Sequence, residues 1–79
     1  MRIAAIKELV SRYSIDQLIQ AEEALLDERE ADIDLGPDDP GDQLTHISGA
    51  LDILRDVEGG ADPKAALRKF TQRVRNSIS

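Results

Sequence analysis

The chain has 79 residues, no cysteine, and a net charge of −6 from sixteen acids and ten Lys and Arg residues. A chain this short forms one domain at most and buries only about 60–65% of its unfolded surface, so its core is thin. The missing cysteines exclude a disulfide framework, a thiolate zinc site and cysteine catalysis. No apolar run approaches the roughly 20 residues that span a bilayer, so we expect a soluble, cytoplasmic protein with no membrane contact.

Two amphipathic helices are predicted at the start of the chain, over about residues 2–13 and 14–30. Ser14 and Gln17 have the spacing of a capping box at the start of the second helix, where a hydroxyl accepts a backbone N–H. Ser14 is the only break between the two helices, which therefore meet at a sharp corner. Apolar residues recur at three- and four-residue steps, as on one face of a helix: Ile3, Ile6, Leu9, Val10 and Tyr13, then Ile15, Leu18, Ile19, Leu25 and Leu26.

The stretch 31–42 is predicted to be an acidic loop, because it holds two prolines, two glycines and five aspartates. Its two apolar residues, Ile33 and Leu35, are expected to pack onto the core and to order it. The aspartates superficially resemble a calcium-binding loop that starts at Asp32. That motif fails at three positions, because Gly36, Pro37 and Gln43 stand where a ligand, a glycine and a bidentate Glu are required. We therefore expect no metal and no cofactor.

Two further helices are predicted over about residues 42–58 and 62–79. Asp42 is the expected N-cap of the third helix, and the pair Gly59-Gly60 ends it. Asp62 caps the fourth helix, with a proline following at the first helical position. The third helix is apolar over nearly half its circumference, so it should lie centrally and touch several neighbours. The apolar face of the fourth helix consists of Leu67, Phe70, Val74 and Ile78. The predicted fold is thus all-α, a compact bundle of four helices in a single domain, 1–79.

Charge is unevenly distributed along the chain. Residues 22–42 carry ten acids and one base, whereas residues 64–79 carry five bases and no acid. The simplest interpretation is intramolecular, with the last helix packed near the acidic loop. The alternative is that the basic face contacts an acidic protein or phosphate groups. The residues that would carry this contact are Arg68, Lys69, Arg73 and Arg75.

Three other residues are unusual for their positions. Glu22 falls in the middle of the apolar stripe of the second helix, so it should be paired with Tyr13 or with an Arg of the last helix, or serve as an acid or base in a cleft. His46, the only histidine, is expected at the boundary of the third helix with a local hydrogen bond to Asp42. Gly49 lies inside that helix, where it would permit close approach of another backbone, such as the acidic loop, or of a second copy of the chain.

Three strings, AEEALLDE (21–28), GDQLTHISGALDI (41–53) and ALRKFTQRVRNSIS (66–79), resemble a family of short, uncharacterised bacterial proteins classed as a domain of unknown function. The similarity covers nearly the whole chain. It implies a compact helical fold and no assigned activity, cofactor or partner. The resemblance rests on these positions among others: Glu22, Thr45, His46, Gly49, Arg68, Arg73 and Arg75.

Three hypotheses for function follow. The first is a non-catalytic module that binds a protein partner through the basic helix, with the acidic loop as a second contact surface. The second is nucleic-acid binding through the same bases, which the acidic total and the lack of interleaved aromatics disfavour. The third is an enzyme or small-ligand protein, which requires Glu22 and His46 to converge on one pocket. A homodimer is compatible with each, because it would enlarge a thin core.

Overall fold

The structure, a computed structural model, describes residues 2–78 and the side chains of residues 2–76. The described residues form four helices and no strand: α1 (Ile3–Arg12), α2 (Ile15–Leu26), α3 (Pro40–Glu58) and α4 (Pro63–Ile78). This confirms the predicted all-α bundle with an acidic loop before the third helix. The side chain of Ile78, predicted for the inner face of α4, lies outside the described ones.

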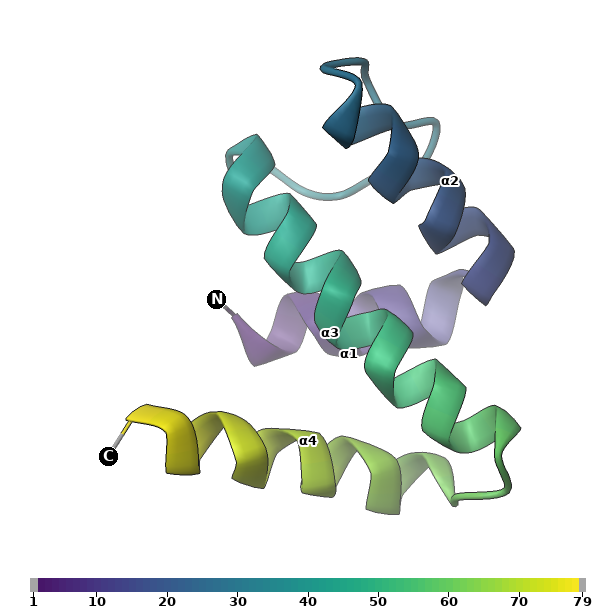
Figure 1. The fold of residues 1–79 in the computed structure, drawn as a ribbon, viewed down its shortest axis with the longest axis vertical. Coiled ribbons are helices and arrows are strands. Elements are labelled where there is room, and N and C mark those ends of the chain that lie inside the picture. The colour runs from purple at the N-terminus through teal and green to yellow at the C-terminus, as the bar shows by residue number, and fades with distance from the viewer. Residues whose placement is uncertain (1, 79) are drawn as a thin grey trace.

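The central element is α3, which packs against each of the other three helices (Figure 1). Its central position was expected from its broad apolar face. The buried hydrophobic core draws on every helix and consists of Ile6, Leu9, Leu18, Ala21, Ala24, Ile47, Ala50, Leu51, Ile53, Ala66 and Phe70. The molecule is only 17 Å across its thinnest direction, about two helix layers, so the core is as thin as the chain length implied.

The predicted helix starts at Ser14 and Asp62 are present. The Ser14 hydroxyl accepts the Gln17 N–H at 3.3 Å, and the Gln17 side chain accepts the Ser14 N–H at 2.9 Å. An Asp62 carboxylate oxygen accepts the N–H groups of Lys64 and Ala65 at 3.1 and 3.3 Å. These bonds satisfy backbone donors that have no partner inside the helix, which fixes where α2 and α4 begin.

Helix α2 ends at Leu26, four residues before the predicted end near Glu30. Glu28 adopts a left-handed conformation with φ of 59°. The N–H of Arg29 then bonds to the carbonyl of Ala24, and the N–H of Glu28 bonds to that of Leu25. This pattern is a Schellman motif, which usually has glycine at the left-handed position. No glycine marks this helix end in the sequence, because a glutamate occupies the left-handed position.

Helix α3 begins at Pro40, with Asp39 rather than Asp42 as its N-cap. The Asp39 side chain accepts the N–H of Asp42 at 3.0 Å, and the proline occupies the first turn. The predicted cap was therefore wrong. Asp39-Pro40 repeats the Asp-Pro start of α4, and the prolines and glycines around it had been assigned to the loop. At the other end the prediction holds, since Gly60 has φ of 107° and follows the last turn of α3.

The acidic loop, residues 27–39, is anchored to the core rather than free. Ile33 and Leu35 are partly buried and pack against the core cluster, as predicted. The Tyr13 hydroxyl accepts the backbone N–H of Asp34 at 3.2 Å, which ties the loop to the end of α1. The Gln43 side-chain amide also donates to the carbonyl of Gly36 at 3.2 Å. The loop is thus held between α1 and the first turns of α3.

The acidic loop and α4 lie at opposite ends of the molecule along its longest axis (Figure 1). The predicted packing of the last helix near the loop is therefore wrong. Helix α3 spans the distance between them, because its N-terminus adjoins the loop and its C-terminus turns directly into α4. Opposite charges that the sequence suggested would compensate one another are instead separated.

None of the helices in the described part of the chain is long and apolar enough to cross a membrane.

Candidate functional site

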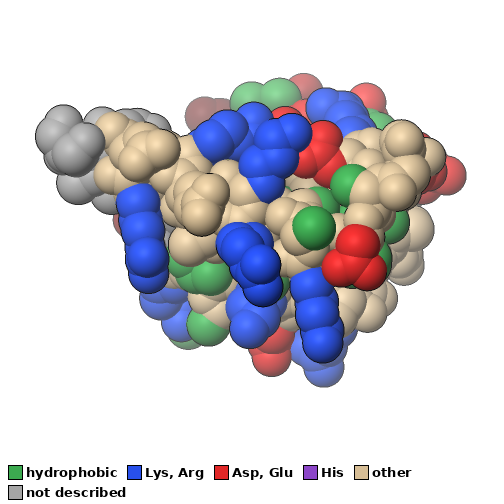
Figure 2. All heavy atoms as spheres, turned by 90° about the horizontal axis from the view of Figure 1, so that it is seen from below, with side chains coloured by type: hydrophobic (Ala, Val, Ile, Leu, Met, Phe, Trp, Pro, Cys, Tyr) green, Lys and Arg blue, Asp and Glu red, His purple; other side chains and the backbone are tan. Residues whose placement is uncertain are grey.

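The basic face of α4 carries five exposed Lys and Arg side chains and no acid. Lys and Arg side chains gather on the end of the molecule where α4 lies, with hydrophobic atoms visible between them (Figure 2). Four of the helix's five basic residues are the predicted contact residues Arg68, Lys69, Arg73 and Arg75, and the fifth is Lys64; all are exposed. This face arises because the buried side of the helix holds Ala66 and Phe70, which leaves the long charged side chains outside.

One basic side chain of this face is close to an acid of α3. Arg73 lies 3.7 Å from Asp52 of α3, and both side chains are about half exposed. Among residues 2–76, no acid lies within ion-pair distance of Lys64, Arg68, Lys69 or Arg75. The positive charge of these four side chains is therefore available to an outside partner. The exposed pair Arg73–Asp52 contributes about 1 kcal/mol at most.

A small apolar hollow lies beside the basic face, between α1 and α4. Its volume is ≈ 160 Å³, and it is lined by Val10, Pro63 and Leu67 with the side chains of Lys7 and Lys64 at its edge. We call it the lysine-edged hollow. The sequence did not reveal it, because Lys7 and Val10 come from α1 and meet α4 only in the folded chain. Apolar side chains beside cations are suited to a partner that carries both carboxylates and aliphatic groups.

His46 is fully buried rather than at the boundary of α3, with an exposure of 1%. Its Nε2 accepts the backbone N–H of Arg2 at 3.0 Å, and its Nδ1 lies 3.9 Å from a carboxylate oxygen of Asp38. The same oxygen pairs with the guanidinium of Arg2. The predicted bond to Asp42 is absent, because Nε2 is occupied by the N–H of Arg2 and Nδ1 faces Asp38. His46 therefore joins the start of α1 to the end of the acidic loop.

The hydrogen bond from Arg2 also sets the tautomer of the ring. Because Nε2 accepts, the neutral imidazole carries its proton on Nδ1, which faces Asp38 across 3.9 Å. Nδ1 is buried and has no hydrogen-bond partner among the described atoms. A side chain this enclosed is suited to holding chain segments together, whereas an acid or base must reach its substrate.

Glu22 lacks both of the partners predicted for it, and Gly49 has other neighbours than those predicted. Glu22 is partly buried on α2. The Tyr13 hydroxyl bonds to the acidic loop instead of to Glu22, and the arginines of α4 are at the other end of the molecule. At Gly49, an added Cβ would come within 2.7 Å of Phe70 Cζ and 2.9 Å of Ile6 Cδ1. The close approach is thus made by side chains of α1 and α4, and not by the loop or by another backbone.

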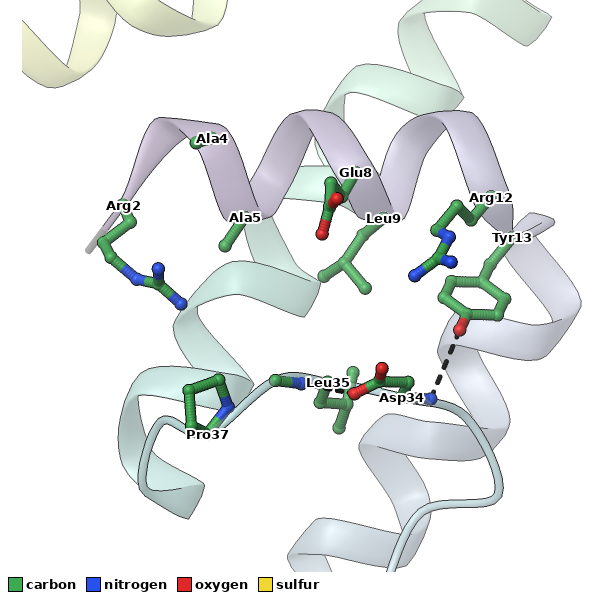
Figure 3. Close-up of a pocket in the computed structure, with 11 residues that line it drawn as sticks. Arg2, Ala4, Ala5, Glu8, Leu9, Arg12, Tyr13, Asp34, Leu35 and Pro37 are labelled. Carbon is green, nitrogen blue, oxygen red and sulfur yellow. Dashed lines mark hydrogen bonds between the residues drawn. The ribbon is translucent and has the colours of Figure 1, made fainter.

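A larger hollow lies beneath α1, between that helix and the acidic loop (Figure 3). Its volume is ≈ 350 Å³. Glu8 and Arg12 project from α1 toward Asp34 and Leu35 of the loop, and Tyr13 closes one end through its bond to the loop. Neither Glu22 nor His46 lines it. The two residues of the enzyme hypothesis are therefore not brought together here.

Within the described residues, no group of three or more His, Asp or Glu side chains is placed to hold a metal ion. Two of the aspartates in the calcium-like spacing have other partners. Asp34 accepts the N–H of Gly36, and Asp38 pairs with Arg2.

The whole chain, residues 1–79, matches the model of a family described as a "Family of unknown function (DUF6952)". The chain belongs to this family. The sequence-based assignment to a family of unknown function is therefore confirmed. The DUF6952 chain matches no curated protein and no solved structure.

Proposed function

We propose that this DUF6952 protein is a non-catalytic docking module of the cytoplasm, which binds an acidic segment of a partner protein through the basic face of α4. The observation that carries the proposal is the set of exposed cations on one helix, namely Lys64, Arg68, Lys69 and Arg75, beside the lysine-edged hollow. The carboxylates of a partner would pair with these cations, and an aliphatic side chain would enter the hollow.

An acidic protein segment fits this surface better than a nucleic acid. Proteins that hold single strands stack bases on exposed aromatic side chains. The chain has two aromatic residues; Phe70 is buried in the core, and Tyr13 is bonded to the acidic loop. The net charge of −6 would also repel a phosphate backbone that extended beyond α4. A short acidic peptide can stay within the length of the helix.

A non-catalytic role is supported by the placement of the titratable residues. His46, the only histidine, is enclosed and holds the backbone of Arg2. Glu22 lies on another helix and lines neither the hollow beneath α1 nor the lysine-edged one. A nucleophile with an adjacent base, which covalent catalysis needs, is not formed by these residues.

The test is fluorescence anisotropy of a labelled peptide composed of Glu and Leu, with mixed-sequence DNA and RNA oligonucleotides as competing probes. The variant Arg68→Gln with Arg75→Gln should bind the peptide roughly tenfold more weakly at low salt, because each exposed pair contributes about 0.5–1 kcal/mol.

The matched control is Arg12→Gln with Arg29→Gln, which removes the same charge from exposed sites outside α4. This control should bind the peptide like the unmodified protein. Equal losses in both variants would indicate a non-specific charge effect and contradict the proposal. Preferential binding of DNA or RNA, falling steeply with salt, would favour the nucleic-acid hypothesis instead.

A further inference from the structure

The end of the molecule opposite α4 has a hollow of its own. It lies between the last turn of α2, the acidic loop and the start of α3, and its volume is ≈ 850 Å³. Partly buried apolar side chains line it, namely Leu25, Ile33 and Leu35, and so do the carboxylate-bearing side chains Glu28, Glu30 and Asp34. We call it the acid-edged hollow. It is an apolar recess surrounded by negative charge.

The charge around this recess is not compensated within the protein. Arg29 is the only base that lines it, and its guanidinium is 3.2 Å from Asp27. No Lys or Arg of residues 2–76 lies within ion-pair distance of Glu28, Glu30 or Asp34. The neighbouring Leu26 is 66% exposed, the one large hydrophobic side chain among the described residues to be so open. An apolar recess with uncompensated acids is suited to a partner that presents cations on aliphatic stems.

A surface with this chemistry is present on the protein itself. The basic face of α4 presents Lys and Arg stems with apolar atoms between them (Figure 2). Residues 64–75 carry five bases and no acid, whereas residues 22–42 carry ten acids and one base. Within one molecule the two surfaces cannot meet, because they lie at opposite ends (Figure 1).

The geometry points to self-association, in which the acid-edged hollow of one copy receives the basic face of α4 from a second copy. This inference rests on the proposed function, because it names a partner for the same α4 surface. Since the two surfaces are at opposite ends, each contact leaves one hollow and one basic face free. The contact is thus head-to-tail, and assembly continues beyond a dimer.

The contact joins surfaces of opposite charge, so it should weaken as salt screens their attraction and should increase with protein concentration. The net charge of −6 on each copy opposes association, so we expect the contact to be weak.

The first experiment is sedimentation velocity of the intact chain over a range of concentrations, at about 50 mM and about 500 mM salt. At low salt the weight-average sedimentation coefficient should rise with concentration without a plateau at the dimer value. At high salt it should return to that of a monomer. A monomer at every concentration in low salt would overturn the inference, as would a dimer that salt does not affect.

The second experiment tests which surfaces meet. The α4 variant (Arg68→Gln with Arg75→Gln) keeps the hollow, and the hollow variant (Glu30→Gln with Asp34→Asn) keeps the basic face. Each variant alone should be mainly monomeric. Their mixture should form a one-to-one complex and nothing larger. The intact hollow of the α4 variant can bind the intact basic face of the hollow variant, and no second pair of intact surfaces remains. The control Glu23→Gln with Glu58→Gln, which removes exposed acids outside the hollow, should assemble like the unmodified chain.

The mixture and the peptide assay together separate the two proposals. The hollow variant should still bind the Glu and Leu peptide, because its α4 is intact. If the peptide binds but no variant or concentration produces assembly, self-association is wrong and the docking function stands. If neither the peptide nor a second copy binds α4, both are wrong. If the hollow variant alone still assembles, the acid-edged hollow is not the surface that receives α4 of the second copy. Circular dichroism melting curves confirm that each variant is folded.

Discussion

Gly49 of α3 lies close to side chains of both α1 and α4. Its missing side chain leaves room for Phe70 of α4 and Ile6 of α1, both of which are buried in the core. A glycine inside a helix costs about 1 kcal/mol relative to alanine, so the sequence marks the position as exceptional. It does not indicate which neighbour uses the space, because that depends on how three helices cross.

We expect Gly49→Ala to lower the free energy of unfolding by about 1 kcal/mol. Overpacking costs about 1–3 kcal/mol, because the Phe70 ring and Ile6 must move, and the better helix propensity of alanine offsets part of this. Urea denaturation followed by circular dichroism measures the change.

The control for this substitution is Gly41→Ala, in the first turn of the same helix. There an added Cβ meets only an Asp39 oxygen at 3.7 Å, so this variant should be as stable as the unmodified chain or more so. If Gly49→Ala were the more stable of the two, the close packing around Gly49 would be wrong.

His46 illustrates a residue whose type the sequence shows but whose environment it does not. We expect His46→Ala to cost about 2–4 kcal/mol, from the cavity and from the unpaired N–H of Arg2. His46→Phe fills the site with a phenyl ring but removes the acceptor nitrogen Nε2, so it should lower the free energy of unfolding by about 1–3 kcal/mol. Chemical denaturation of both variants measures these losses of stability. The control is Thr45→Ala, a substitution at the exposed neighbouring residue. If His46→Ala were as stable as Thr45→Ala, the buried hydrogen bond between His46 and the backbone of Arg2 would contribute nothing to stability, which would contradict this account.

At the scale of the elements, helix ends were predicted correctly where the deciding signal is local: the starts at Ser14 and Asp62 and the end at Gly59-Gly60. Ser14 and Asp62 act locally, since a side-chain oxygen binds N–H groups two or three residues ahead. The same Asp-Pro signal at Asp39-Pro40 was present but surrounded by glycines and a second proline, which are typical of a loop. The end of α2 had no such signal, because Glu28 adopts the conformation that glycine usually takes.

The left-handed Glu28 leads to a prediction for α2. Its Cβ is unfavourable at φ of 59°, and this conformation costs about 1–2 kcal/mol for residues other than glycine. Glu28→Gly should therefore raise the free energy of unfolding by about 0.5–1 kcal/mol. Thermal and urea denaturation would detect this.

Glu23→Gly provides the contrast, because Glu23 is exposed but lies in the interior of α2. That substitution should lower stability by about 1 kcal/mol, the usual cost of glycine in a helix. A loss of stability in both variants would mean that α2 continues beyond Leu26, as the apolar stripe alone suggested.

At the scale of the whole molecule, the dominant feature is the separation of charge. The acidic residues of 22–42 lie at one end, and the bases of α4 at the other. Two acids of 22–42 are paired within the described residues, Asp38 with Arg2 and Asp27 with Arg29. The other acids of this end have no Lys or Arg within ion-pair distance among the described residues, so they repel one another.

Added salt should accordingly stabilise the monomer. Raising the salt from about 50 mM to about 500 mM shortens the screening length to several ångström and weakens repulsion among the exposed acids. We expect the urea midpoint to rise, by the equivalent of about 0.5–1 kcal/mol, at a protein concentration where only monomer is present. A lower urea midpoint in high salt would contradict this expectation. It would show that attraction between the acids of 22–42 and the bases of α4 contributes more to stability than repulsion among the acids subtracts from it.

The sequence by itself determined the helices and their inner faces, because apolar spacing and capping side chains act over three or four residues. It also located the basic side chains of α4, since a helix that turns Leu67, Phe70 and Val74 toward the core places its Lys and Arg residues outside. Only the tertiary structure decided that His46 is enclosed, which neighbours fill the space at Gly49, and that the acidic loop lies far from α4. These outcomes depend on how α3 holds the other helices apart, and crossing geometry is set by the packing of many side chains at once.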